Sequence, residues 1–147
     1  MMQRGEAKGT VTVTIEFFEP MRIPSATHQE KQVAVIKGRP HFYEPQNVKD
    51  ARAKYMAYLG KHAPAEPMGG AIHFMVAFEY HDNSIPKVKG LYKLKDTKPD
   101  TDNMVKLVKD CMTRLGYWHD DAQVCDEIVK KFWHGFDEGI YMKVVGE

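Results

Sequence analysis

Ala71–Tyr80, with the sequence AIHFMVAFEY, is the segment that best defines the fold. β-Branched and aromatic residues recur in it, and it is apolar along most of its length, which is typical of a central strand covered on both faces. Gly69-Gly70 precedes it, and the segment is much too short to cross a bilayer. It therefore predicts the middle of a β-sheet in a globular domain.

The residues before this segment predict shorter elements. Val11, Val13 and Ile15 alternate with threonines, which is typical of a half-buried strand. Further along, apolar residues recur near a 3.6-residue repeat, which indicates a helix. The expected elements are a strand over Val11–Phe18, a strand over Gln32–Ile36, a loop over His41–Pro45, a helix over Gln46–His62 and a linker over Pro64–Gly70.

A second helix is expected from about Asp102 to Leu115, with Pro99 and an aspartate at its start and Gly116 after its end. Its two faces differ in polarity. The apolar face carries Met104, Leu107, Val108, Cys111 and Leu115, and the polar face carries Asp102, Lys106, Lys109 and Asp110. Two further strands are expected, over Ala122–Trp133 and Gly139–Val145.

This order of elements predicts an α/β (α+β) fold, with one mixed β-sheet and two main helices packed on it. A single domain over residues 1–147 is expected, with a flexible, polar segment at residues 1–9 that lacks the apolar core of a signal peptide. Cys111 and Cys125 have no partners at zinc-ligand spacing. Their apolar surroundings predict packed, reduced thiols, which suits a cytoplasmic protein.

Positive charge is concentrated in one part of the chain, although the formal net charge is only +1. Between residues 87 and 98, five lysines stand against Asp96 alone, so that this segment has a net charge of +4. The lysines are Lys87, Lys89, Lys93, Lys95 and Lys98. Such a segment can follow a phosphate backbone, or it can protect an edge strand from aggregation.

Asp100 and Asp102 stand two residues apart at the start of the second expected helix. Carboxylates presented so closely are suitable ligands for Mg²⁺ or Mn²⁺. The alternative is that they cap the helix and interact with its dipole. Lys106 lies on the same helix face, where it can pair with Asp102 or reach a phosphate. Asp120 and Asp121 follow the helix, and reversal of the chain at residues 116–119 can return one of them to the helix start.

The segments KPDTDN (98–103) and GYWHDDAQV (116–124), with Lys106 between them, resemble the signature of the RusA family of crossover-junction endodeoxyribonucleases. The close resemblance covers about thirty residues, from Lys98 to Val129. It implies an α/β homodimer in which Asp100, Asp102 and Asp121 bind the metal and Lys106 is the catalytic lysine. The implied metal is Mg²⁺, for which Mn²⁺ can substitute.

The resemblance also implies the reaction and the substrate. A two-fold symmetric dimer can place two sites on a four-way junction, so the expected activity is paired, symmetric nicking of Holliday junctions. The lysines at 87, 89, 93, 95 and 98 take the place of the family's basic, often arginine-containing segment and are expected to bind DNA. The alternatives are a nuclease for flaps or other branched DNA, a non-catalytic junction-binding protein, and a protein-interaction module.

Overall fold

The computed structural model describes residues 11–27 and 32–147. A five-stranded mixed sheet forms the body, in the strand order β1-β7-β4-β6-β5. Its strands are β1 (Val13–Pro20), β4 (Ile72–His81), β5 (Lys93–Leu94), β6 (Val124–His134) and β7 (Gly139–Gly146). β4 and β6 are parallel, and the other neighbouring pairs are antiparallel. The expected mixed sheet is confirmed, although the expected flexible segment 1–9 lies outside the described residues.

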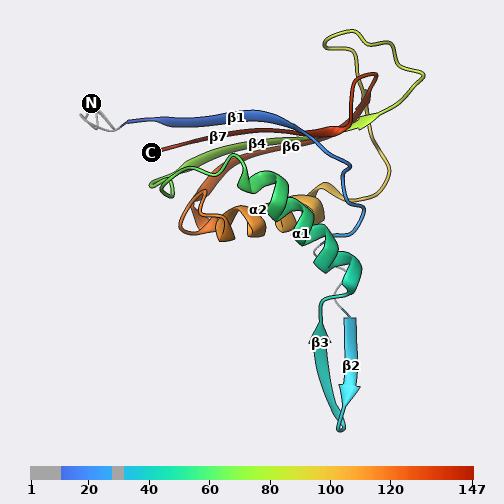
Figure 1. Cartoon of the computed structure of the whole chain (residues 1–147), viewed down its shortest axis with the longest axis vertical. Coiled ribbons are helices and arrows are strands. Elements are labelled where there is room, and N and C mark those ends of the chain that lie inside the picture. Colours follow the sequence, from blue (N-terminus) through green and yellow to red (C-terminus); the bar gives the residue numbers. More distant parts are fainter. Residues whose placement is uncertain (1–10, 28–31) are drawn as a thin grey trace, which may run out of the picture.

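β4 is the central strand, as its composition predicts, but only one face of the sheet is covered by helices. Both α1 (Gln46–Gly60) and α2 (Thr101–Arg114) lie on that face (Figure 1). Phe74, Val76 and Phe78 of β4 point into the core, while His73 and His81 are exposed. The expectation that β4 is covered on both faces is therefore wrong at its two ends. The sequence of β4 is apolar because the strand lies between two other strands and has a long face directed into the core.

The core between the sheet and the helices includes the apolar face of α2. Leu107, Val108 and Cys111 are fully buried there, and Leu115 is half-buried after the helix. Each such aliphatic side chain contributes about 2 kcal/mol by leaving water. Cys125 is exposed, so the expectation of two packed thiols holds for Cys111 alone.

Residues 39–43 form a strand that overlaps the loop expected over His41–Pro45. β2 (Gln32–Ile36) has the expected bounds and pairs with β3 (Arg39–Tyr43) in a hairpin of its own, which projects from the body (Figure 1). Lys37 and Gly38 both have positive φ, as a two-residue hairpin turn requires. The hairpin therefore stands apart from the main sheet and leaves Val35 and Phe42 more than 70% exposed.

The remaining boundaries are close to those expected. β6 begins at Val124 because residues 121–123 form a short 3-10 turn, η1 (Asp121–Gln123), instead of the start of the strand. Arg52 joins the helices through ion pairs with Asp110 of α2 and with Glu44, whose Oε1 lies 2.8 Å from Nη2 of Arg52. Within the described ranges, no helix is long and apolar enough to cross a membrane.

Candidate functional site

Asp100 and Asp102, the acidic pair, stand at the N-terminal end of α2. Asp100 is the residue before the helix, with φ −72° and ψ 139°, and its side chain makes no capping hydrogen bond. Asp102 lies in the first turn, and both side chains are exposed. The hydrogen bonds and ion pairs found within residues 11–27 and 32–147 involve neither carboxylate. The helix-capping alternative is therefore not realised by Asp100, and both carboxylates face solvent.

Two lysines hold the linker that leads into this pair, residues 95–99. Lys131 of β6 donates through Nζ to Pro99 O at 2.6 Å and also to Thr97 O. Lys95 donates through its own Nζ to Thr97 Oγ1 at 2.6 Å and to Lys98 O at 2.7 Å. Backbone carbonyls with no helix or sheet partner thus gain charged donors, which are stronger than neutral ones. This double contact, the lysine clamp, fixes the start of α2 against β6.

Lys95 therefore supports the linker structurally, in place of the role in DNA binding that was expected for it. The residue is only 9% exposed, and its Nζ lies 5.2 Å from the Tyr80 ring centre and 5.1 Å from that of Trp133. Burial, together with the nearby Lys131 charge, lowers the pKa of Lys95. Two of the three N–H donors of this amine are used by oxygens, and its burial beside two aromatic rings leaves it little access to a phosphate.

Lys106 lies one turn after Asp102 on the exposed face of α2. No ion pair joins the two side chains, so the local i,i+4 pair expected as an alternative is not formed in the described part of the chain. Lys109, three residues on, does have a partner, because its Nζ lies 2.8 Å from Glu127 Oε1 of β6. Lys106 is thus the α2 lysine that remains available to a ligand.

η1 separates the roles of the two adjacent aspartates. Asp120 precedes the turn, and its Oδ1 accepts from Ala122 N at 2.9 Å. Gln123 completes a capping box, because its Oε1 accepts from Asp120 N at 3.0 Å, and its Nε2 donates to Met68 O and Gly70 O. Asp120 is therefore a structural cap, whereas the side chain of Asp121 is exposed and makes no hydrogen bond within the described ranges.

Gln123 and Lys131 are the positioning residues that the sequence analysis missed. The spacing of Asp120 and Gln123 matches a capping box, so Gln123 had a recognisable signal. Lys131 had none, because a lysine on a strand gives no sign of the distant carbonyl that it contacts. Tyr117 and Trp118, in the turn after α2, are both buried, and they donate to Leu59 O and Thr113 Oγ1, respectively.

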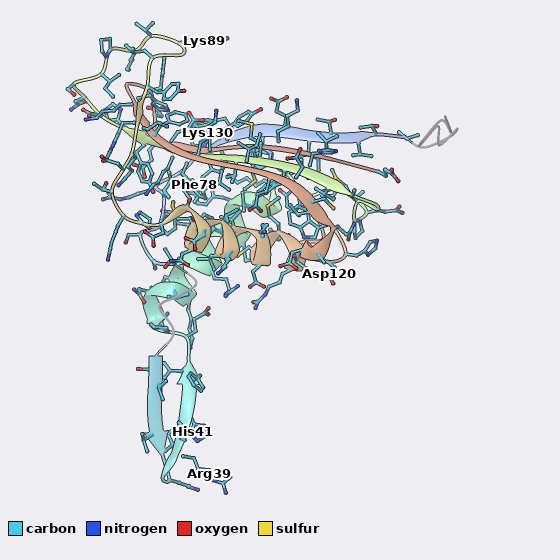
Figure 2. All side chains as sticks on the ribbon, turned by 180° about the vertical axis from the view of Figure 1, so that it is seen from behind. Arg39, His41, Phe78, Lys89, Asp120 and Lys130 are labelled. Atoms are coloured by element: carbon cyan, nitrogen blue, oxygen red, sulfur yellow. The ribbon has the colours of Figure 1, made fainter. Side chains whose placement is uncertain are left out.

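Asp121 does not return to the acidic pair within one chain. α2 has 14 residues, and a helix of this length is about 21 Å long. The acidic pair stands at its N-terminal end, while η1 follows its C-terminal end, where Figure 2 labels Asp120. The turn after α2 reverses the chain into β6, so Asp121 stays at the far end.

Contacts between α2 and β6 independently indicate the same separation between Asp121 and the acidic pair. Pro99 lies beside Lys131 and Lys109 beside Glu127, so the helix and the strand run antiparallel. Val124, which follows η1, is seven residues from Lys131 along β6, or about 23 Å in an extended strand. Accordingly, no group of three acidic, histidine or cysteine side chains in the described residues could hold a metal ion. One chain does not by itself provide the three-carboxylate site.

The other lysines of the basic segment are exposed. Lys87 and Lys89 lie in the loop after β4, where Figure 2 shows Lys89 projecting from the body. Lys93 lies in β5 at the edge of the sheet, and Lys98 lies in the linker. Only residues 93 and 94 of this segment form a strand, so its exposed lysines are presented mainly from a loop.

Comparisons with known proteins agree with the motifs. Residues 20–145 match the family model for endodeoxyribonuclease RusA. The chain is also 32% identical over 109 residues to a crossover junction endodeoxyribonuclease rusA of Lactococcus phage r1t. That alignment covers 73% of this chain and 79% of the phage protein. The match includes both helices, the strands β4, β5 and β6, nearly all of β7 and all four charged residues expected to form the site, but only the last residue of β1. The chain belongs to the RusA family of endodeoxyribonucleases.

Proposed function

We propose that this endodeoxyribonuclease resolves Holliday junctions by paired symmetric nicks and depends on a divalent metal, Mg²⁺ or Mn²⁺. The single observation that carries the proposal is the acidic pair, whose carboxylates are exposed and unpaired at the end of a linker held by two lysines. Such rigid support is typical of a functional site and unnecessary for solvated surface charges. The junction as substrate is supported by the name of the phage relative.

Asp100 and Asp102 are the residues proposed to hold the metal. Mg²⁺ is commonly bound by one or two carboxylates together with water and phosphate oxygens, so the donor types of the pair suit it. Asp121 is proposed as the third carboxylate, although within one chain it lies at the other end of α2. Lys106 is proposed to place its positive charge beside the scissile phosphate, where charge develops during cleavage.

DNA is proposed to contact the exposed lysines of the basic segment. Lys87, Lys89, Lys93 and Lys98 have exposed side chains, and phosphate contacts of this kind position DNA without reading its sequence. DNA affinity falls as salt concentration rises, and each phosphate contact adds about 1 to the steepness of log affinity against log salt concentration. A Lys89→Ala, Lys93→Ala double variant should therefore make this dependence shallower by about 2. Lys49→Ala, on α1, serves as the control. An unchanged slope in the double variant would exclude both lysines from the interface.

Cleavage of labelled four-way junctions, flaps and linear duplex tests the function. With Mg²⁺ or Mn²⁺, the wild type should nick the junction symmetrically and leave the duplex intact. Asp102→Asn should abolish cleavage while junction binding is retained. Asp96→Asn is the matched control, because it removes the same charge four residues before Asp100 and should still cut. Preferential cutting of flaps would show that the substrate is flap DNA and not the four-way junction. Binding without cutting by the wild type would refute the catalytic function.

A further inference from the structure

The face of the sheet that carries no helix has a row of aromatic side chains near the basic segment. Phe132 of β6 pairs in register with Glu79 of β4, whose neighbour Phe78 points into the core. Phe132 therefore lies on the helix-free side, and so does His134, two residues further along the strand. The rings follow one another at centroid distances of 4.9, 5.7 and 5.8 Å, and this aromatic row consists of Tyr92, Phe132, His134 and Phe136.

The two ends of the aromatic row are open to solvent. Tyr92 is 50% exposed and Phe136 is 41% exposed. Phe18 of β1, which lines the same pocket as Phe136, is 39% exposed. Exposed apolar side chains that gather in one place mark a binding surface, whereas scattered ones need no explanation. Flat aromatic rings in particular are surfaces on which nucleic-acid bases stack.

A pocket of about 330 Å³ lies at the Phe136 end of the row, and it contains a carboxylate with a free acceptor atom. His134 Nδ1 accepts from Phe136 N at 3.0 Å, so the ring proton is on Nε2, which donates to Glu79 Oε1 at 2.8 Å. No other hydrogen bond to Glu79 occurs within residues 11–27 and 32–147. Its Oε2 is therefore left to accept from a ligand. The lining residues are Phe18, Glu79, Lys87, His134, Phe136 and Asp137.

Lysines stand on both sides of the aromatic row. Lys87 lines the pocket together with Asp137. Lys130 is exposed two residues before Phe132 and so lies on the same side of the sheet. Figure 2 labels Lys130 and Phe78 on opposite sides of the sheet. Rings flanked by positive charge match a strand of nucleic acid, which offers bases to the rings and phosphates to the lysines.

We propose that this face binds an unpaired DNA strand, with bases stacked on the aromatic row and an amino-bearing base held in the pocket by Glu79. A base in a duplex is already stacked on its neighbours, so the rings favour DNA with unpaired bases. A carboxylate oxygen accepts from the exocyclic amino group of cytosine, and thymine has no such group. The inference rests on the proposed function only in taking this strand to belong to branched DNA.

Fluorescently labelled single-stranded oligonucleotides test the proposal in EDTA, where no metal-dependent cleavage occurs. The wild type should bind oligodeoxycytidine about tenfold more tightly than oligothymidine, which is the effect of one hydrogen bond to a charged group. Tyr92→Leu and Phe136→Leu should each weaken binding of both oligonucleotides about tenfold, because each variant loses one stacking ring. Phe136→Tyr keeps the ring and is the matched control, so it should keep the wild-type affinity.

Glu79→Gln tests the pocket separately from the row. Glutamine can still accept from His134 through its oxygen, but it presents an amide donor in place of Oε2. The preference for deoxycytidine should therefore disappear, and a preference that survives would overturn the role of Glu79. Glu66→Gln, which changes an exposed carboxylate in the loop before β4, should keep the preference. Thermal unfolding checks that each variant folds, and if Glu79→Gln does not, the two leucine variants decide the proposal.

The wild type distinguishes failure of this inference from failure of the proposed function. Cutting of a fully paired four-way junction without any binding of single strands at low salt would overturn the inference alone. Strand binding that both leucine variants leave unchanged would overturn it as well. If the wild type binds single strands as described but cuts no branched DNA with Mg²⁺ or Mn²⁺, the proposed function fails and the strand-binding face stands.

Discussion

Replacing Lys95 by methionine should destabilise the protein and leave the salt dependence of DNA binding unchanged. Methionine keeps the apolar stem between Tyr80 and Trp133 but removes the amine that donates to Thr97 Oγ1 and Lys98 O. Lys93→Met, two residues earlier on the exposed edge, is the matched control. The pair of variants distinguishes a lysine that supports the fold from one that contacts phosphate.

The size of the effect follows from the contacts of Lys95. Both acceptor residues are exposed and regain water after the substitution, so each lost hydrogen bond costs about 1 kcal/mol. The two ring contacts add roughly 0.5 kcal/mol each. Relief of the cost of burying an ammonium group offsets roughly 1 kcal/mol of this sum. The net loss is about 2 kcal/mol, which lowers Tm by about 6 °C in a chain of this size.

Thermal unfolding and junction binding over a range of salt concentrations measure the two effects. Lys95→Met should have the lower Tm and the wild-type salt slope, and it should cut at least about tenfold more slowly because its acidic pair is less well placed. Lys93→Met should keep the wild-type Tm, and the dependence of its log affinity on log salt concentration should be shallower by about 1. A Lys95→Met protein with unchanged Tm and a shallower slope would refute the structural role of this lysine.

Three further substitutions follow from side-chain contacts and burial in the structure. Tyr117→Phe removes the hydroxyl that donates to Leu59 O, and urea unfolding should show a loss of about 1.5 kcal/mol. Gln123→Ala removes the side chain that holds η1, so cleavage should fall while junction affinity is kept in binding assays. Burial raises the pKa of the Cys111 thiol to about 11, above its unfolded value, so the folded state should lose stability as pH rises from about 9 towards 11. Urea titrations across that range should show the loss, and Cys111→Ala should remove it.

Periodicity predicted the main elements because their inner faces are strongly apolar. α2 and β4 lie within two residues of their expected bounds, since Leu107, Val108 and Phe78 point into the core. β3 was not predicted because its residues are all exposed. Burial therefore imposes no alternation of apolar and polar residues on Arg39–Tyr43. The turn at Lys37-Gly38 is the local signal for that hairpin, and it depends on backbone conformations that composition does not reveal.

The residues of the candidate site were easier to predict than their arrangement. Asp100, Asp102 and Asp121 were selected by residue type, spacing and resemblance, none of which depends on the path of the chain. Their distance depends on that path, and the six residues between α2 and η1 are compatible with more than one direction. The structure gives the direction, because Trp118 and Gln123 fix the turn to Thr113 and to the 68–70 backbone.

The lysines show why charge in a sequence identifies a region better than it identifies contacts. Lys93 and Lys95 are two residues apart with the same side chain, yet one is exposed and the other is 9% exposed. The difference arises from the partners that the fold supplies: two aromatic rings and two oxygens surround the amine of Lys95.

This buried charge, together with Lys131, lies beside the start of α2, where the helix dipole already favours anions. Two neighbouring carboxylates without a bound cation repel each other, and the positive groups behind them offset that repulsion. The acidic pair is open to solvent on the outer side of this linker, so its outer face is left for a ligand.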